Sequence, residues 1–153
     1  MNKPYAYYEH KKLKDFKELL TLNLSDKKDE VAFIFNNARK EEIKKTYNDF
    51  YNDVRILSNY LSNNYKNKHI ALIGENSYNY LVLFFSIIIS KNIAVLIDKD
   101  LSTDKINELL KKSDSKVIYY SKNYCDLEGL EKKYKSYYID DIDVLIKDNK
   151  DLE

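Results

Sequence analysis

The chain has 153 residues and a net charge of +1 at pH 7, from 26 Lys and Arg against 25 Asp and Glu. This length corresponds to about one domain, and the balanced charge argues against a nucleic-acid-binding protein, which concentrates basic residues on one face. The single cysteine, Cys125, excludes an intramolecular disulfide, and two glycines, Gly74 and Gly129, are too few for the glycine-rich phosphate loops of nucleotide-binding proteins.

The N-terminal part is predicted to contain a lead-in, a short helix and a hairpin. Residues 1–11 have no continuous apolar run, so no secretory signal is expected. An apolar segment at 31–35, a turn-like segment and a second arm at 42–46 predict a β-hairpin. Four apolar residues share one face of a helix predicted within residues 12–23: Leu13, Phe16, Leu19 and Leu20.

A longer helix is predicted to begin at Thr46. Asp49 lies three residues later, where its carboxylate can accept hydrogen bonds in the first turn, as in a capping box. Apolar residues then recur at helical spacing until about Asn63: Phe50, Val54, Leu57 and Leu61.

The segment from 69 to 120 alternates between strands and helices. The strands are predicted at 70–73, 93–97 and 117–120, with helices after the N-cap residues Ser77 and Ser102 or Thr103. Parallel strands joined by helices form right-handed crossovers. The predicted fold is therefore α/β: a three-layer Rossmann-like parallel sheet with crossover helices, plus an N-terminal hairpin.

The helix after Ser77 is apolar almost all round between residues 80 and 89, which predicts burial on every side. It has about half of the roughly 20 residues needed to span a bilayer, so no membrane span is expected. In the acidic C-terminal part, residues 137–139 and 144–146 are candidates for short strands.

Three loops at the carboxyl ends of the strands are candidates for a site: residues 74–77, 98–100 and 121–123. Ser77 could help to hold an anion, but N-capping alone explains it. Asp98 and Asp100 could form a metal pair, but a turn before a helix favours Asp in any case. Asp140, Asp141 and Asp143 are interpreted as a solvated turn, and His10 and His69 have no companion at ligand spacing. No catalytic or metal-ligating residue is assigned.

Several segments resemble the opening of AMP-forming acyl-CoA synthetases. Residues 46–50 resemble T-Y-x-E-F, and residues 70–77 resemble V-A-I-x-x-x-N-S, with Asn76 and Ser77 in register. Residues 92–101 resemble N-V-V-V-P-L-D-K-x-L. The likeness extends from about residue 13 to residue 121. Lys91 and Leu96 stand where that family usually has Gly and Pro, so we expect a reshaped loop there.

For the intact enzyme, the resemblance implies reaction of ATP, with Mg²⁺, and a fatty or other acyl acid to give an acyl-adenylate. A thioester with coenzyme A or a carrier thiol would follow. The family's phosphate-binding loop and catalytic lysine come after this region. The expected organisation is a lead-in at 1–11, an N-terminal subdomain at 12–146 and a truncated tail at 147–153, inactive alone. The alternative is a free-standing, catalytically dead α/β interaction module.

The expected partner is the remainder of the ligase, with neither nucleic acid nor membrane. If the missing part leaves an apolar face uncovered, a homodimer should form through that face. Alternatively, residues 124–146 fold back and cover the helix after Ser77. Because cysteine use is minimal and no signal is present, a cytoplasmic location is expected.

Overall fold

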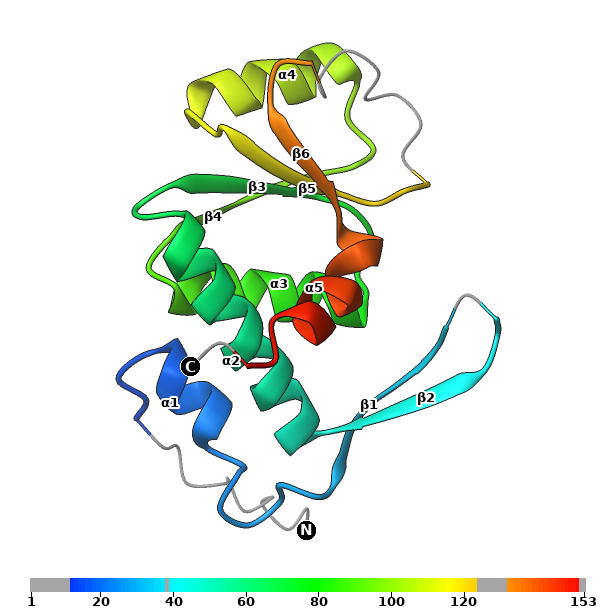
Figure 1. Ribbon diagram of the computed structural model, residues 1–153. Coiled ribbons are helices and arrows are strands. Elements are labelled where there is room, and N and C mark those ends of the chain that lie inside the picture. Colours follow the sequence, from blue (N-terminus) through cyan, green and yellow to red (C-terminus); the bar gives the residue numbers. More distant parts are fainter. Residues whose placement is uncertain (1–11, 38, 124–131, 152–153) are drawn as a thin grey trace, which may run out of the picture.

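The computed structural model describes residues 12–37, 39–123 and 132–151. Within these ranges a four-stranded parallel sheet lies between helices, and a separate antiparallel hairpin extends to one side (Figure 1). This is the three-layer α/β fold with a hairpin that the sequence predicts. The lead-in at 1–11 lies outside the described residues, as do Cys125 and Gly129.

The N-terminal half follows the predicted order. Its elements are α1 (Phe16–Thr21), β1 (Val31–Asn36), β2 (Glu42–Thr46) and α2 (Tyr47–Asn64). The predicted capping box begins α2: the Asp49 N–H donates to Thr46 Oγ1 at 3.1 Å, and the Thr46 N–H donates to the Asp49 carboxylate at 2.8 Å. The hydrogen bond from the Thr46 backbone is the main cause that lowers the pKa of Asp49.

The parallel sheet has the strand order β4-β3-β5-β6. Its strands are β3 (His69–Ile73), β4 (Ile93–Ile97), β5 (Val117–Tyr120) and β6 (Lys135–Tyr138). Helix α3 (Tyr78–Ile89) connects β3 to β4, and α4 (Thr103–Lys112) connects β4 to β5. Because the chain passes from β4 to the far side of β3, the order of the strands reverses between β3 and β5.

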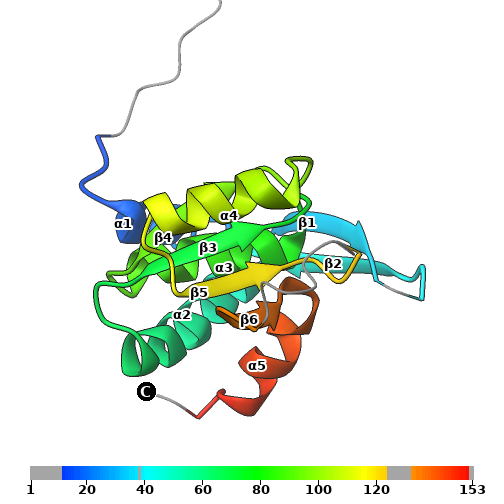
Figure 2. The same ribbon diagram turned by 90° about the horizontal axis from the view of Figure 1, so that it is seen from above.

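The sheet is covered on both faces, and each face has its own core. Helix α4 lies over one face (Figure 2), where Ile106 and Leu110 pack on Ile73 and Ile118. Helices α2 and α3 cover the other face and bury most of the remaining apolar side chains, including Leu57, Leu72 and Leu83. Burial on both faces explains why β3 is a continuous apolar run.

Helix α3 is less enclosed than its composition predicts. Val82, Leu83, Ser86 and Ile87 are buried, whereas Phe84, Phe85, Ile88 and Ile89 are half-buried, so burial on every side is a wrong prediction. The buried stripe is the one that faces α2 and the sheet, because a helix packed on one layer keeps an outer face. No helix in the described ranges is long and apolar enough to cross a membrane.

From residue 132 the C-terminal segment folds back onto the α2 and α3 side of the sheet. It covers α3 only in part, since Phe84, Phe85, Ile88 and Ile89 stay half-buried, and residues 124–131 of the second alternative lie outside the described residues. After β6 come a 3₁₀ turn, η2 (Ile139–Asp141), and α5 (Ile142–Asp148). The predicted strand at 144–146 is wrong, since these residues lie in α5. Ile139, Ile142 and Ile146 are three and four residues apart and all buried, which is helical spacing.

Candidate functional site

At the carboxyl edge of the sheet, the structure brings the predicted loops at 74–77 and 121–123 together around Gly74. The predicted loop at 98–100 lies beside them. The Glu75 N–H donates to Ser121 Oγ at 3.4 Å. On the other side, the Lys99 ammonium lies 3.9 Å from the Glu75 carboxylate. This edge is where open α/β sheets bind ligands, above all where the strand order reverses.

The crevice between β3 and β5, where the order reverses, is filled by the chain's own side chains. A Cβ atom added to Gly74 would lie 2.4 Å from Ser121 Oγ and 2.9 Å from Ile139 Cδ1. The Ser121 N–H also donates to the Ile73 carbonyl oxygen at 3.1 Å, which draws the loop over the strand end. A side chain at position 74 would therefore require Ser121 and Ile139 to move.

The C-terminal segment holds the loop at 121–123 in place. The Lys122 N–H donates to the Asp140 carboxylate at 2.8 Å, and the Lys122 ammonium pairs with Asp141. The hydrogen bond to Asp141 raises the pKa of Lys122. Asp140 is exposed, and Asp140 and Asp141 lie in η2 and fasten it to the end of β5. Asp143 is also exposed, but it lies in the first turn of α5 and not in a turn, so that part of the prediction is wrong.

A hollow of about 350 Å³ remains open between the ends of β3 and β4. The carboxylate of Asp98 accepts the Asp100 N–H at 2.9 Å, so Asp98 shapes the turn as predicted. The Lys99 ammonium lies 2.7 Å from Asp100, and this hydrogen bond raises the pKa of Lys99. The carboxylates therefore already have partners within the loop.

The side chains that the sequence offers as candidates for an anion or metal site have other partners where the structure describes them. Ser77 Oγ accepts the Tyr80 N–H at 3.1 Å, so Ser77 is the N-cap of α3, which is the alternative to a role in anion binding. Within the described ranges no group of three His, Cys, Asp or Glu side chains could hold a metal ion. His69 Nδ1 is hydrogen-bonded to the Ser113 carbonyl oxygen, and His10 lies outside the described residues.

Sequence reasoning missed the contact of Ser121 and Ile139 with Gly74. One signal could have indicated it: Gly74 follows a buried strand in a chain that has only two glycines. A glycine kept in such a position indicates a close approach of another chain segment.

The family described as AMP-binding enzyme matches residues 21–151. The N-terminal domain of FACL13 from Mycobacterium tuberculosis superposes with a TM-score of 0.77 at 16% identity, covering 92% of this chain and 37% of that chain. For a fatty acid AMP ligase from Legionella pneumophila the TM-score is 0.67 at 12% identity, with 90% and 25% covered. A comparison with curated protein sequences finds no match.

The fold is also similar to that of O-succinylbenzoate coenzyme A synthetase from Bacillus subtilis, solved with ATP and magnesium ion. That superposition has a TM-score of 0.68 at 17% identity and covers 84% of this chain and 33% of that chain. The chain thus spans between 25% and 37% of the length of these three proteins. The match across residues 21–151 leads to one conclusion: the chain belongs to the AMP-binding enzyme family.

Proposed function

We propose that this chain is the N-terminal part of an adenylate-forming ligase. The intact enzyme would use ATP and Mg²⁺ to activate a carboxylic acid as an acyl-adenylate and then form a thioester. The family match across residues 21–151 carries this proposal. It is supported by relatives that are longer ligases, one of them solved with ATP and magnesium ion.

Within that enzyme, residues 12–146 would serve as a structural subdomain. The filled crevice at Gly74 and the occupied carboxylates at 98–100 support a role without direct contact to nucleotide. We therefore assign no catalytic residue and no cofactor to this chain, and expect it to be inactive alone. ATP, Mg²⁺ and coenzyme A would bind to the other parts of the enzyme.

The substrate is proposed to be a fatty or other acyl acid, and the acceptor coenzyme A or a carrier thiol. Two of the similar proteins support this range: a fatty acid AMP ligase and an O-succinylbenzoate coenzyme A synthetase. The reaction would take place in the cytoplasm, with neither nucleic acid nor membrane as a partner. The remainder of the ligase would be the main partner of this chain.

The reading frame downstream of the codon for Glu153 tests the proposal. We expect an in-frame continuation that encodes a Thr/Ser/Gly-rich loop with a lysine. A stop codon there would favour the free-standing interaction module. Titration of the isolated chain with Mg-ATP should show no binding in the low micromolar range, and tight binding would contradict the assignment of ATP to other parts.

In isolation, a homodimer is proposed through an exposed apolar face that the remainder of the ligase would cover, and the outer edge of β4 is a candidate for this face. Ile93 and Leu96 on this edge strand are 49% and 55% exposed. Unpaired strand edges with apolar side chains readily pair with another chain. Sedimentation velocity should show a dimer at about 100 µM, where interfaces of roughly −6 kcal/mol become populated. Leu96→Lys should make the chain monomeric, and an unchanged dimer would place the interface elsewhere.

A further inference from the structure

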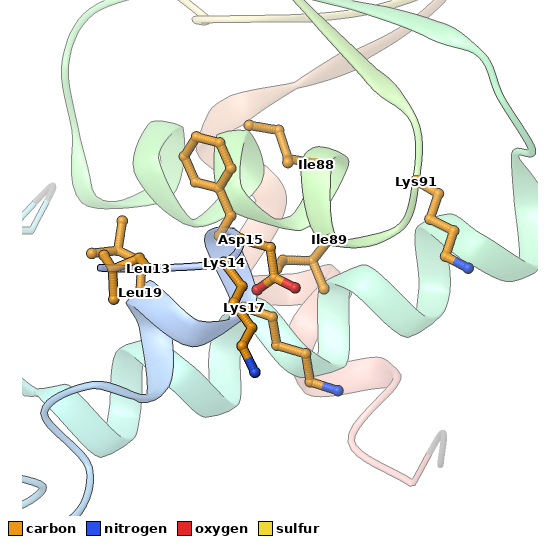
Figure 3. Close-up of a pocket in the computed structure, with 9 residues that line it drawn as sticks. Leu13, Lys14, Asp15, Lys17, Leu19, Ile88, Ile89 and Lys91 are labelled. Atoms are coloured by element: carbon orange, nitrogen blue, oxygen red, sulfur yellow. The ribbon is translucent and has the colours of Figure 1, made fainter. Parts of the chain in front are cut away.

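A second hollow, of about 690 Å³, lies between α1 and the C-terminal end of α3 (Figure 3). We call it the α1–α3 groove. Its apolar walls are formed by Leu13, Phe16, Leu19, Ile88 and Ile89. It lies at the opposite end of α3 from the loop at Gly74, about 18 Å away along a helix of 12 residues. The groove is therefore separate from the edge of the sheet described above.

The apolar wall on the α1 side is concentrated in one short segment. Leu13, Phe16 and Leu19 are 40%, 41% and 39% exposed. Single exposed apolar residues are common on protein surfaces, but a cluster indicates a binding surface. The Phe16 ring also packs edge to face on Phe84 and Phe85, with ring centroids 6.3 and 5.7 Å apart. These contacts hold α1 against α3, so the groove is formed before any ligand arrives.

The rim of the groove is cationic. Lys14, Lys17 and Lys91 line it together with a single carboxylate, that of Asp15. The Asp15 carboxylate already accepts the Glu18 N–H at 2.8 Å. No ion pair joins these three lysines to an acid within the described part of the chain. Figure 3 shows Lys14 and Lys17 extending on the same side of the groove.

We propose that the α1–α3 groove binds a free long-chain carboxylate. The alkyl chain would lie on Leu13, Leu19 and Ile89, and the carboxylate would lie near the ammonium groups of Lys14 and Lys17. The volume is within the range of about 300–1,000 Å³ that is typical of small-molecule sites, which are apolar with few polar groups. The ammonium groups of Lys14 and Lys17 would attract a carboxylate and not a neutral ligand.

A second copy of the chain fits this groove less well. In a two-fold symmetric dimer the same patch contacts itself, so the lysines of one rim would approach the lysines of the other. Like charges in such an arrangement are unfavourable. The homodimer proposed above uses the edge of β4 and does not need this rim.

Calorimetric titration of the chain with dodecanoate, below its micelle concentration, tests the proposal. We expect one saturable site per chain, and weaker binding of dodecanol and of dodecyltrimethylammonium. Shortening the carboxylate by two methylenes should weaken binding about tenfold, because each buried methylene contributes strongly. Leu19→Trp locates the site: the chain has no other tryptophan, so its emission should shift when dodecanoate binds.

Two charge variants separate the rim from general electrostatics. Lys14→Gln with Lys17→Gln should weaken dodecanoate about fivefold and leave dodecanol unchanged, as expected for two exposed charge contacts. Lys111→Gln with Lys147→Gln removes the same charge elsewhere and should change neither. Equal losses in both double variants, or equal affinity for dodecanol and dodecanoate, would overturn the proposal.

Two further results would assign the groove to another occupant. Binding to anionic vesicles without binding of free dodecanoate would indicate a membrane surface. Conversion of a dimer to a monomer by dodecanoate in sedimentation velocity would indicate a second copy. The first result would refute a site for a free carboxylate, and the second would refute the separation of the groove from the dimer interface.

Discussion

The chain makes a tight turn at each end of α3, but different residues form the two turns. At the N-terminal end the chain turns out of β3 at Gly74, where a Cβ atom would lie 2.4 Å from Ser121 Oγ. At the C-terminal end it turns into β4 through Lys91, with φ at 61°, in the left-handed region. Glycine suits both positions, yet only the first has it.

The C-terminal end of α3 is a complete Schellman motif without glycine. The Lys91 N–H donates to the Ile88 carbonyl oxygen and the Asn92 N–H to that of Ile87, both at 3.0 Å. Asp114, with φ at 52°, follows α4 in the same way. The difference teaches that a side chain at Lys91 strains only its own backbone, whereas a side chain at Gly74 would force Ser121 and Ile139 to move.

The largest expected effect concerns the residue that fills the crevice. Ile139 is 2% exposed and lies against Gly74, so Ile139→Ala should reduce the free energy of unfolding by about 2–5 kcal/mol through the cavity it leaves. Val144→Ala, at a residue of the same C-terminal segment that is 53% exposed, should change it by less than about 0.5 kcal/mol. Urea denaturation measures both, and equal losses would show that the crevice is not packed.

Adding a methyl group to the glycine tests the same contact from the other side. Gly74→Ala should reduce the free energy of unfolding by about 1–3 kcal/mol, because Ser121 and Ile139 must move. Ser121→Ala removes the Oγ atom that would lie 2.4 Å from the added Cβ. The double variant Gly74→Ala with Ser121→Ala should therefore recover part of the lost stability. A double variant in which the two losses simply add would contradict the steric explanation.

The elements that the sequence predicts correctly depend on local patterns. The capping box of Thr46 and Asp49, the caps at Ser77 and Ser102, and the alternation from β3 to β5 need only neighbouring residues. The resemblance to a known family added a prediction of the domain type to these local predictions. The departure at Lys91 does not require a different turn, because its φ of 61° is the conformation that glycine would favour.

What the sequence does not predict depends on contacts between distant segments. Gly74 meets Ser121 and Ile139, which are far away along the chain, so the filled crevice has no local signal. The error at residues 144–146 has another cause. A short apolar run fits a strand or a helix equally well. The helix is favoured here because Ile146 is buried together with Ile139 and Ile142, at helical spacing. The α1–α3 groove also depends on packing that no local pattern encodes.

At the C-terminal end of α3, loss of the hydrogen bonds of Asn92 is expected to have the next largest effect on stability. Its side chain is buried, accepts the Lys68 N–H at 2.9 Å and donates to the Tyr65 carbonyl oxygen at 3.2 Å. Asn92→Ala should reduce the free energy of unfolding by about 1–2 kcal/mol, since these backbone groups lose their partner. Asn64→Ala removes an exposed hydrogen bond to the Tyr60 carbonyl and should have little effect. Similar losses in both variants would mean that burial of Asn92 is unimportant.

The smallest expected effect is a gain of stability at Lys91. A lysine with φ at 61° is strained, and glycine adopts this conformation without steric conflict. Glycine also increases the entropy of the unfolded chain, which offsets part of the gain. Lys91→Gly should therefore raise the free energy of unfolding by only about 0.5 kcal/mol. Asn67→Gly is the matched control: its φ is 52°, but asparagine tolerates the left-handed region, so no gain is expected. A loss of stability in Lys91→Gly would show that the lysine side chain makes a stabilising contact at this end of α3. Side-chain contacts, and not backbone strain, would then determine the residue at both ends of the helix.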